Sequence, residues 1–362
     1  MLQFVYRKNN TKQRMVGFMK RKIRFGIIGC GVIADFHANA IMELQDEAIL
    51  VGVTDVVYDA AEKFSKRHGI RVFATLEEML SSSEIDVVNI CTPSGYHAEV
   101  VIKAAKAGKH IIVEKPMAIT KEQLDSIEDA CRDSNIILSS ISQNRFSRGV
   151  TITRRAIEEG LLGRILCADI YMKYNRTQEY YDSGSWRGTK RVDGGGALMN
   201  QGIHGVDLIQ YLAGSLKSVY ALSKTLVRRI EVEDTLSAVV EYKSGAIGVI
   251  QATTSVYPGY PRRLEINGEK GSIALEETSI VRWDIDNSKY EDIVLQPSFI
   301  SSTATPTALS TAEHRNQISD VIRAIKTKTK PLIDFEEGRK AVDIILAIYK
   351  SAEEKRTVFL DD

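Results

Sequence analysis

The segment 193–211 carries polar residues whose types and spacing could place a proton-transfer group on one side of a helix. Four of them recur at the spacing i, i+4, i+7 and i+11: Asn200, His204, Asp207 and Tyr211. At this spacing they share one helix face, while the other faces are apolar. A polar stripe on a buried helix costs free energy unless its members are paired or used in chemistry. A single histidine there is usually a satisfied core residue, but the stripe and the glycine run 194–196 before it favour a general base at His204.

Lys115 is a second candidate for chemistry because it directly follows a short apolar strand. Glu114-Lys115-Pro116 ends the predicted strand 111–113, and ligands gather at the carboxyl ends of parallel strands. A lysine at this place could be solvated or paired with Glu114, or it could stabilise the negative charge that develops on an alkoxide. The residues alone leave both interpretations open.

A glycine-rich turn near the start of the fold has the spacing of a dinucleotide-binding loop. Gly29-x-Gly31-x-x-Ala34 follows a predicted strand and opens a predicted helix, so it allows a tight turn and a close approach to a pyrophosphate. Asp55 ends the second predicted strand, where a carboxylate accepts ribose hydroxyls and repels a 2′-phosphate. The motif predicts NAD rather than NADP, against the alternative of a glycine turn that binds no ligand.

Further side chains lie where they could contact cofactor or substrate. Arg145 follows the last predicted strand of the first half, and an interdomain ion pair is its alternative role. Trp186 and Arg187 lie in an irregular stretch before the glycine run, where Trp186 could instead be a packing anchor. Tyr260 lies in a loop that contains proline and glycine. Three more candidates follow the predicted strand 87–90 and so lie at the same carboxyl-end edge of the predicted sheet as Lys115: Thr92, Pro93 and His97.

The elements that must position these residues follow two different patterns. Up to about residue 145, short apolar strands alternate with helices, which predicts a parallel sheet covered on both faces. The predicted strands are 23–28, 49–53, 87–90, 111–113 and 136–141, and the predicted helices are 32–44, 58–68, 96–107 and 120–133. Further predicted elements are helix 148–159, strand 165–174, helix 197–213 and helices near 313–327 and 336–351. Hairpin turns at 243–245 and 267–271 predict a second, α+β domain with a mostly antiparallel sheet.

Composition limits the classes of partner. The 362 residues hold 48 basic and 47 acidic side chains, a formal net charge of +1, whereas nucleic acids and anionic membranes select basic surfaces. No stretch approaches the roughly 18 apolar residues of a membrane helix. Residues 1–34 contain no Asp or Glu, and we expect 1–21 to be a disordered basic extension, with an organelle presequence as the alternative.

Cysteine and histidine spacing argues against a metal site. The four cysteines include no C-x-x-C pair, which fits a reducing cytoplasm, and the six histidines form neither H-x-x-x-H nor H-E-x-x-H. We therefore expect no metal, and metal-dependent hydrolysis is a weak rival function. A second rival, a non-catalytic NAD-binding regulator, stays open because binding a nucleotide needs no base.

Taken in order, the glycine loop, the Thr-Pro-x-x-x-His stretch, Glu-Lys-Pro and the Gly-Gly-Gly helix with its histidine resemble the Gfo/Idh/MocA family of sugar and cyclitol oxidoreductases. The resemblance covers the chain from about Lys22 to its end. It implies that Lys115 and His204 flank the reacting carbon beside the nicotinamide, that Trp186-Arg187 approaches both ligands, and that the protein is a homodimer or homotetramer. Many members have aspartate where this chain has Asn200, and the Asn-Gln-Gly-Ile-His version looks like members that act on UDP-linked N-acetylglucosaminuronate.

The sequence thus predicts an N-terminal Rossmann domain over 22–145 and an α+β substrate-binding and oligomerisation domain over 146–362. The expected reaction is hydride transfer between NAD and a secondary alcohol of a sugar or cyclitol, with a nucleotide-linked sugar as the alternative substrate. His204 is the expected base and Lys115 the donor to the oxygen, although Lys115 could itself be the base. Predicted catalytic residues are Lys115, His204 and Asn200; predicted substrate contacts are Lys115, Arg145, Asn200, His204 and Tyr260. Predicted cofactor contacts are Gly29, Gly31, Val32, Ile33, Asp55, Thr92, Pro93, His97, Glu114, Lys115, Trp186 and Arg187.

Overall fold

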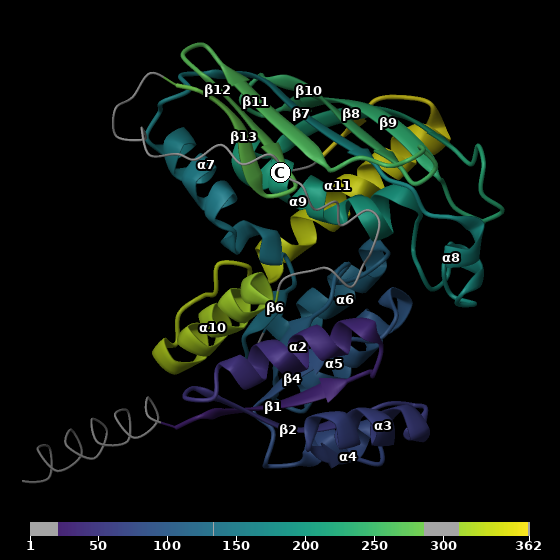
Figure 1. Ribbon diagram of the computed structural model, residues 1–362, viewed down its shortest axis with the longest axis vertical. Coiled ribbons are helices and arrows are strands. Elements are labelled where there is room, and N and C mark those ends of the chain that lie inside the picture. The colour runs from purple at the N-terminus through teal and green to yellow at the C-terminus, as the bar shows by residue number, and fades with distance from the viewer. Residues whose placement is uncertain (1–20, 133, 286–310, 361–362) are drawn as a thin grey trace, which may run out of the picture.

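The computed structural model describes residues 21–132, 134–285 and 311–360, which form two lobes (Figure 1). One lobe, at the bottom of the view, is built on a six-stranded sheet, and the other, at the top, on an eight-stranded sheet. The predicted basic extension 1–21 lies outside the described residues except for Arg21. Within the described part, no helix is both long and apolar enough to cross a membrane.

The first lobe has a doubly wound parallel sheet in the order β3-β2-β1-β4-β5-β6. Its strands are β1 (Ile23–Ile28), β2 (Ala48–Thr54), β3 (Arg71–Val72), β4 (Val87–Ile90), β5 (His110–Val113) and β6 (Leu138–Ser140). Its helices are α2 (Val32–Glu43), α3 (Tyr58–His68), α4 (Leu76–Ser81), α5 (His97–Lys106) and α6 (Lys121–Arg132). Every strand and helix predicted for this half is present. The pattern missed β3 and α4 because one is two residues long and the other six, too short for a recognisable period.

The strand order changes direction between β1 and β4, and there the functional loops meet. Strands β1, β4 and β5 lie side by side and end at Ile28, Ile90 and Val113. The glycine loop, the Thr92-Pro93 turn and the Glu114-Lys115-Pro116 turn therefore share one edge of the sheet. Ligands bind at this switch point in doubly wound sheets because the loops on either side turn away from each other.

The second lobe has a mixed sheet in the order β13-β12-β11-β7-β10-β9-β8-β14, in which β7 and β10 are parallel and the other neighbours are antiparallel. Its strands are β7 (Ile165–Lys173), β8 (Leu216–Lys224), β9 (Thr235–Tyr242), β10 (Ile247–Thr253), β11 (Arg263–Gly268), β12 (Ser272–Glu276), β13 (Ser279–Asp284) and β14 (Val358–Phe359). The predicted hairpins at 243–245 and 267–271 join β9 to β10 and β11 to β12. The mostly antiparallel second domain is thus confirmed.

Helices cover one face of this second sheet. α9 (Ile203–Ala213) and α11 (Phe335–Glu354) lie beneath the strands in Figure 1, with α7 (Arg148–Glu158) at one end and the short α8 (Gln178–Asp182) at the other. Inward side chains such as Ile250 and Leu264 are fully buried, and alternate positions point away from the helices. The short 3₁₀ segments η1 (Ser94–Tyr96) and η2 (Gln143–Phe146) follow β4 and β6.

The chain returns to the first lobe near its end. Helix α10 (Ala312–Thr327) packs against α2 beside the parallel sheet (Figure 1), and its side chains Ile318, Val321 and Ile322 belong to the hydrophobic core of that lobe. The helix itself was predicted, but its place in the nucleotide lobe was not. The division at residue 145 therefore separates the sheets but not the whole chain.

Candidate functional site

The glycine loop has the geometry that a bound pyrophosphate requires. Gly29 has φ +96°, and a Cβ there would press against the backbone of Cys91. Gly31 is the N-terminal cap of α2, and a Cβ there would meet no atom within 4 Å. There is therefore open space beside the loop at the start of α2, as an anion-binding helix N-terminus requires.

The residues around this loop fit NAD. Val32 is 63% exposed, so an apolar side chain beside the loop is left for a ligand to cover. Asp55 accepts hydrogen bonds from the amides of Cys30 (2.7 Å) and Val57 (2.8 Å), and a carboxylate has further lone pairs for ribose hydroxyls. Thr92 Oγ1 is buried and has no hydrogen-bond partner among the described residues, as expected of an atom that hydrogen-bonds a ligand.

Lys115 connects the two lobes at the sheet edge. Its Nζ donates a hydrogen bond of 2.9 Å to the backbone carbonyl oxygen of Asn200. Burial lowers the pKa of Lys115 below its ordinary value, and the carboxylates of Glu114 and Asp193 oppose that shift in part. The ammonium form of Lys115 is therefore less stable than that of a lysine on the protein surface.

Asn200 and His204 belong to the predicted helix 197–213, whose first part has an unexpected form. Residues Ala197–Gly202 (η3) are a π-helical turn, which continues into α9 at Ile203. Such turns are rare and often occur at functional sites. Burial and the nearby cations Lys115 and Arg262 hold the pKa of His204 well below its ordinary value. His204 is therefore a neutral imidazole near pH 7, able to accept a proton.

The glycine run 194–196 is required by packing. A Cβ on Gly194 would overlap Ile119, one on Gly195 would overlap Tyr349, and one on Gly196 would overlap the carbonyl oxygen of Glu233. The run therefore brings the start of η3 against three other segments of the chain, and this contact fixes where Asn200 and His204 stand.

Glu233 holds the first turn of η3 in place. Its carboxylate accepts hydrogen bonds from the amides of Gly196 (3.0 Å) and Leu198 (2.9 Å) and from the hydroxyl of Tyr349 (2.8 Å). Burial raises the pKa of Glu233. The side chain caps otherwise unpaired amides at a helix start. Sequence reasoning missed it, because nothing in the pattern links residue 233 to residue 196.

The predicted polar stripe divides into two functions. Lys115 contacts the backbone of Asn200 and its charge acts on His204, whereas Asp207 forms a buried ion pair with Arg145 (2.6 Å). Arg145 also pairs with Glu337 (2.8 Å) and stacks on the ring of Tyr211. Its side chain has no exposed surface, so the predicted substrate contact of Arg145 is corrected to the ion pair considered as its alternative. The two ion pairs of Arg145 therefore fasten α9 and α11 to η2, the segment that follows β6.

Two residues predicted to bind the cofactor are buried instead. His97 is 1% exposed, and its ring nitrogens lie 2.7 Å from the carbonyl oxygens of Pro116 and Thr92. Its ring therefore joins the two loops at the sheet edge and has no free nitrogen to offer a cofactor. Glu114 is 5% exposed, and its Oε2 accepts the amide of Lys115 (3.1 Å). Both side chains therefore hold the loops of the site in place and do not line it.

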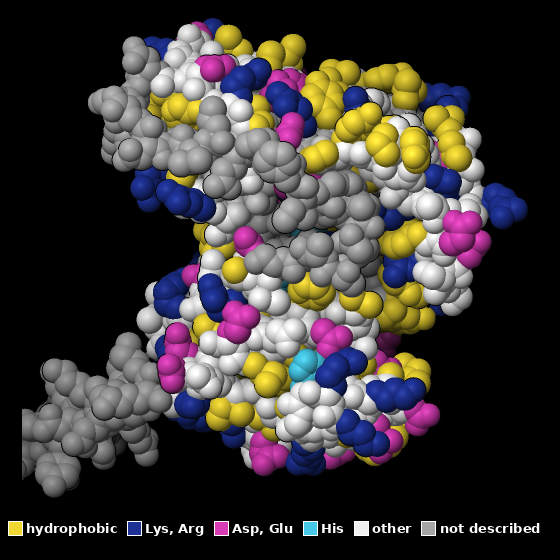
Figure 2. Space-filling view, in the orientation of Figure 1, with side chains coloured by type: hydrophobic (Ala, Val, Ile, Leu, Met, Phe, Trp, Pro, Cys, Tyr) yellow, Lys and Arg dark blue, Asp and Glu magenta, His cyan; other side chains and the backbone are white. Residues whose placement is uncertain are grey.

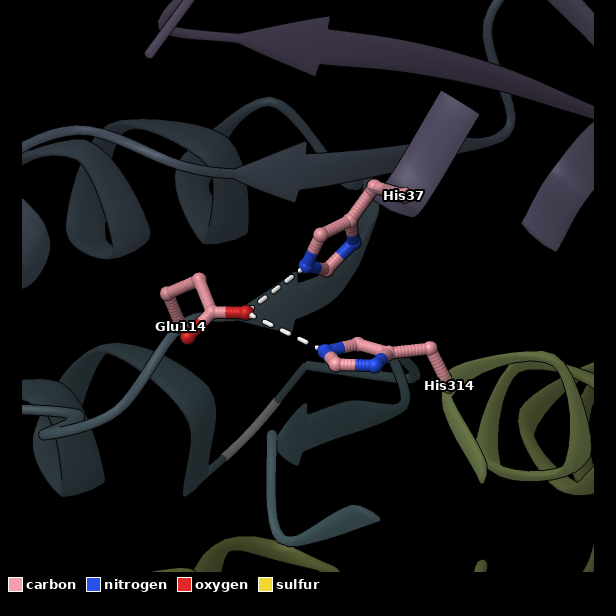
Figure 3. A group of neighbouring side chains, drawn as sticks. All are labelled: His37, Glu114 and His314. Carbon is pink, nitrogen blue, oxygen red and sulfur yellow. Dashed lines mark hydrogen bonds and ion pairs between the residues drawn. The ribbon is translucent and has the colours of Figure 1, made fainter. Parts of the chain in front are cut away.

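Glu114 lies with two histidines in a buried cluster (Figure 3). His37 Nε2 is 2.8 Å from Glu114 Oε1, and His314 Nε2 is 3.8 Å from the same oxygen. Asn89 holds the other nitrogen of His37 at 2.7 Å. Although burial alone would raise the pKa of Glu114, its contacts with the two histidines hold that pKa well below the ordinary value.

Such a group has the residue types of a zinc site, but two of its members are joined by a direct hydrogen bond. Two ligands at ~2.0 Å from a tetrahedral ion stand about 3.3 Å apart. The 2.8 Å between His37 and Glu114 is instead a direct hydrogen bond. The cluster links α2, the end of β5 and α10. Sequence spacing could not reveal it, because its members are far apart in the chain.

The irregular stretch 175–193 supplies a polar wall. Arg187 donates to the hydroxyl of Tyr180 (2.6 Å), and its guanidinium lies over the rings of Tyr180 and Trp186. Gln201 donates to the same hydroxyl (3.0 Å). Trp186 and Arg187 are partly exposed, as the predicted contacts require, whereas Tyr180 and Gln201 were not predicted. Tyr260 is 51% exposed in the loop before β11.

Comparisons with known proteins give this geometry a family. Residues 23–141 match the oxidoreductase family with an NAD-binding Rossmann fold, and residues 150–274 match the GFO/IDH/MocA C-terminal domain. Myo-inositol 2-dehydrogenase of Thermotoga maritima is 28% identical over 94% of this chain and 99% of its own. Inositol 2-dehydrogenase of Rhizobium meliloti is 28% identical over 93% of this chain and 98% of its own.

A solved structure is more similar still. The WlbA dehydrogenase of Bordetella pertussis, in complex with NADH and UDP-GlcNAcA, is 35% identical and superimposes with a TM-score of 0.84, covering 94% of this chain and 100% of that one. The chain belongs to the Gfo/Idh/MocA family and is an NAD-dependent dehydrogenase of the sugar and cyclitol type.

Proposed function

We propose that this dehydrogenase oxidises a secondary alcohol carbon of a sugar or cyclitol at the edge of the parallel sheet, between Lys115 and His204. NAD, when held by the glycine loop and Asp55, would supply the acceptor for the hydride of that carbon. His204 accepts the proton of the hydroxyl, because its imidazole is neutral at working pH. Lys115 donates a hydrogen bond to the oxygen as it gains charge, and Asn200 fixes the position of the hydroxyl.

One observation carries the proposal. The Lys115 ammonium comes from the nucleotide lobe and binds the backbone of Asn200, four residues before His204 in the other lobe. A cation and a neutral imidazole are thus held together above the end of β5, beside the glycine loop. A nucleotide-binding regulator that performs no chemistry has no need of this pair.

A nucleotide-linked sugar acid is the substrate that a specific observation favours. Arg187 and Arg176 both lower the pKa of Lys115, so several positive charges converge on the site. In the described part of the chain Arg187 binds a tyrosine hydroxyl and two rings but no carboxylate. A guanidinium placed in this way can bind an anionic group. The 35% identical WlbA dehydrogenase holds a UDP-linked sugar of this kind, UDP-GlcNAcA.

The outer face of the eight-stranded sheet is the surface we propose for self-association. Tyr220, Val239 and Val249 are register partners on three neighbouring strands, and the first two are 43% and 60% exposed. Leu222 and Ile247 add to this row, and Figure 2 shows hydrophobic side chains gathered over the upper part of the molecule, where these strands lie. An apolar patch of this kind favours a second copy of the chain as partner, in a homodimer or homotetramer.

The catalytic assignment predicts large losses of turnover. His204→Ala and Lys115→Met should each lower kcat by roughly 10²–10⁴-fold, because each removes a positioned proton-transfer or charge-stabilising group. Initial rates of NADH formation on a substrate found by screening inositols, free sugars and UDP-sugars measure this. Lys121→Met, an exposed lysine on α6, is the control and should keep wild-type rates.

Two results would contradict the assignment. Near-normal turnover of both variants would show that the chemistry lies elsewhere. Wild-type protein that binds NAD but reduces it with no tested alcohol would favour the regulator.

The pH profile separates the two arrangements of acid and base. With His204 as base, its low pKa keeps it unprotonated, so kcat/KM for alcohol oxidation should hold down to below pH 6.5 and fall as pH rises through the lowered pKa of Lys115. Lys115→Arg stays protonated and should remove that alkaline fall. If kcat/KM instead rises with pH through the Lys115 pKa, Lys115 is the base and His204 is not.

The substrate proposal predicts a selective loss at Arg187. Arg187→Met should lower kcat/KM for UDP-N-acetylglucosaminuronate by about 10-fold or more, because a hydrogen bond to a charged group is lost. Turnover of neutral sugars should change much less. Arg191→Met, exposed on the same stretch, is the matched control. Equal losses on charged and neutral substrates would reject an anion-binding role.

The proposed interface predicts that a substitution within it lowers the mass of the oligomer. Val239→Asp should shift the protein towards monomers in light scattering coupled to size exclusion, because a buried carboxylate at the centre of the patch would have no partner. Val56→Asp, fully exposed on the other lobe, should leave the mass unchanged. An unaltered mass for Val239→Asp would place the interface elsewhere.

A further inference from the structure

Asp193 stands just before the glycine run and makes direct contact with the proposed site. It is 1% exposed, and its Oδ2 accepts a hydrogen bond of 2.8 Å from the amide of Gly188. Its Oδ1 accepts from the side-chain Nδ2 of Asn200. The carboxylate thus has one oxygen fixed by backbone and the other directed at a predicted catalytic residue.

This contact decides which end of the Asn200 amide faces the site. A carboxylate only accepts hydrogen bonds, so the amide must present its nitrogen to Asp193 and its oxygen to the opposite side. Gln201 Nε2 donates to that oxygen at 3.1 Å, which agrees with the same orientation. A substrate hydroxyl that binds Oδ1 must therefore be the donor. Because the reacting hydroxyl gives its single proton to His204, that donor is a second hydroxyl of the substrate.

Asp193 also acts on the second group of the site. The backbone carbonyl of the same Asn200 accepts from Lys115 Nζ, and the charge of Asp193 raises the pKa of Lys115 against the effect of burial. One buried carboxylate therefore reaches both the amide that orients the substrate and the ammonium that stabilises the reacting oxygen.

We propose that Asp193 is a positioning residue: it holds the Asn200 amide with its carbonyl oxygen towards a neighbouring hydroxyl of the substrate and supplies the negative charge that Asn200 lacks. The inference rests on the proposed roles of Lys115 and Asn200. Asp193 touches neither substrate nor cofactor in this scheme and works through Asn200 and Lys115.

The decisive experiment exchanges the two side chains. Asp193→Asn removes the charge and should lower kcat about 10- to 100-fold, as expected when a hydrogen bond to a charged group is lost. The kinetic pKa of Lys115 should also move to lower pH, since the anion that stabilised its ammonium is gone. Asn200→Asp alone sets two carboxylates in contact and should be at least as impaired.

The double variant Asp193→Asn/Asn200→Asp restores one amide and one carboxylate in reverse order. It should recover at least about 10-fold in kcat over Asn200→Asp and return the pH profile towards that of the wild type, which a merely structural residue would not do. Should Asp193→Asn fail to fold, the comparison of Asn200→Asp with the double variant still measures the pair, with thermal unfolding and NADH binding as checks on both proteins.

The possible failures are distinguishable. Wild-type kcat and pH profile in Asp193→Asn, or a double variant no better than Asn200→Asp, would overturn the role of Asp193 while an inactive Lys115→Met leaves the proposed function standing. Turnover retained in Lys115→Met would instead reject the proposed function, and the inference with it.

Discussion

The site depends on one hydrogen bond that crosses between the lobes, from Lys115 Nζ to the carbonyl oxygen of Asn200. Neither lobe holds the reacting groups alone, because the nucleotide loop and Lys115 come from one sheet and His204 comes from a helix beneath the other. The distance between these groups is therefore set by how firmly the lobes are joined. A shift of about 1 Å in such a geometry can cost on the order of a hundredfold in rate.

Several contacts behind the site resist that shift. The Arg145–Asp207 pair is fully buried and ties α9 to the end of β6, while the amide of Gly95 donates to the carbonyl of Val192 across the lobes (2.7 Å). Breaking a buried ion pair leaves an uncompensated charge, which makes this junction stiff. The return of α10 to the first lobe adds a second connection, in which His314 approaches Glu114 directly behind Lys115.

The sequence predicted the parts of this arrangement that are local. The glycine loop, Lys115 and the pair Asn200 and His204 are recognisable because each motif lies within a few residues and has a strand or helix of clear period beside it. Arg145 was misassigned for the opposite reason, since its partners Asp207 and Glu337 are 62 and 192 residues away. No pattern along the chain distinguishes an arginine that meets a substrate from one that meets such partners.

The same limit applies to the form of the catalytic helix. Its apolar faces predicted a regular helix over 197–213, but the first turn is π-helical. A hydrogen-bond span that is one residue longer in a single turn is too small a change to see in hydrophobic spacing. What imposes the wider turn lies elsewhere in the chain: Glu233 holds the amides of Gly196 and Leu198, and the absence of a side chain on Gly196 lets the Glu233 backbone approach. Asn200 and His204 therefore owe their positions to a buried carboxylate that cannot reach the substrate. The free-energy cost of burying the Glu233 carboxylate is offset by the three hydrogen bonds that it accepts. These hydrogen bonds also fix the geometry of the neighbouring π-helical turn.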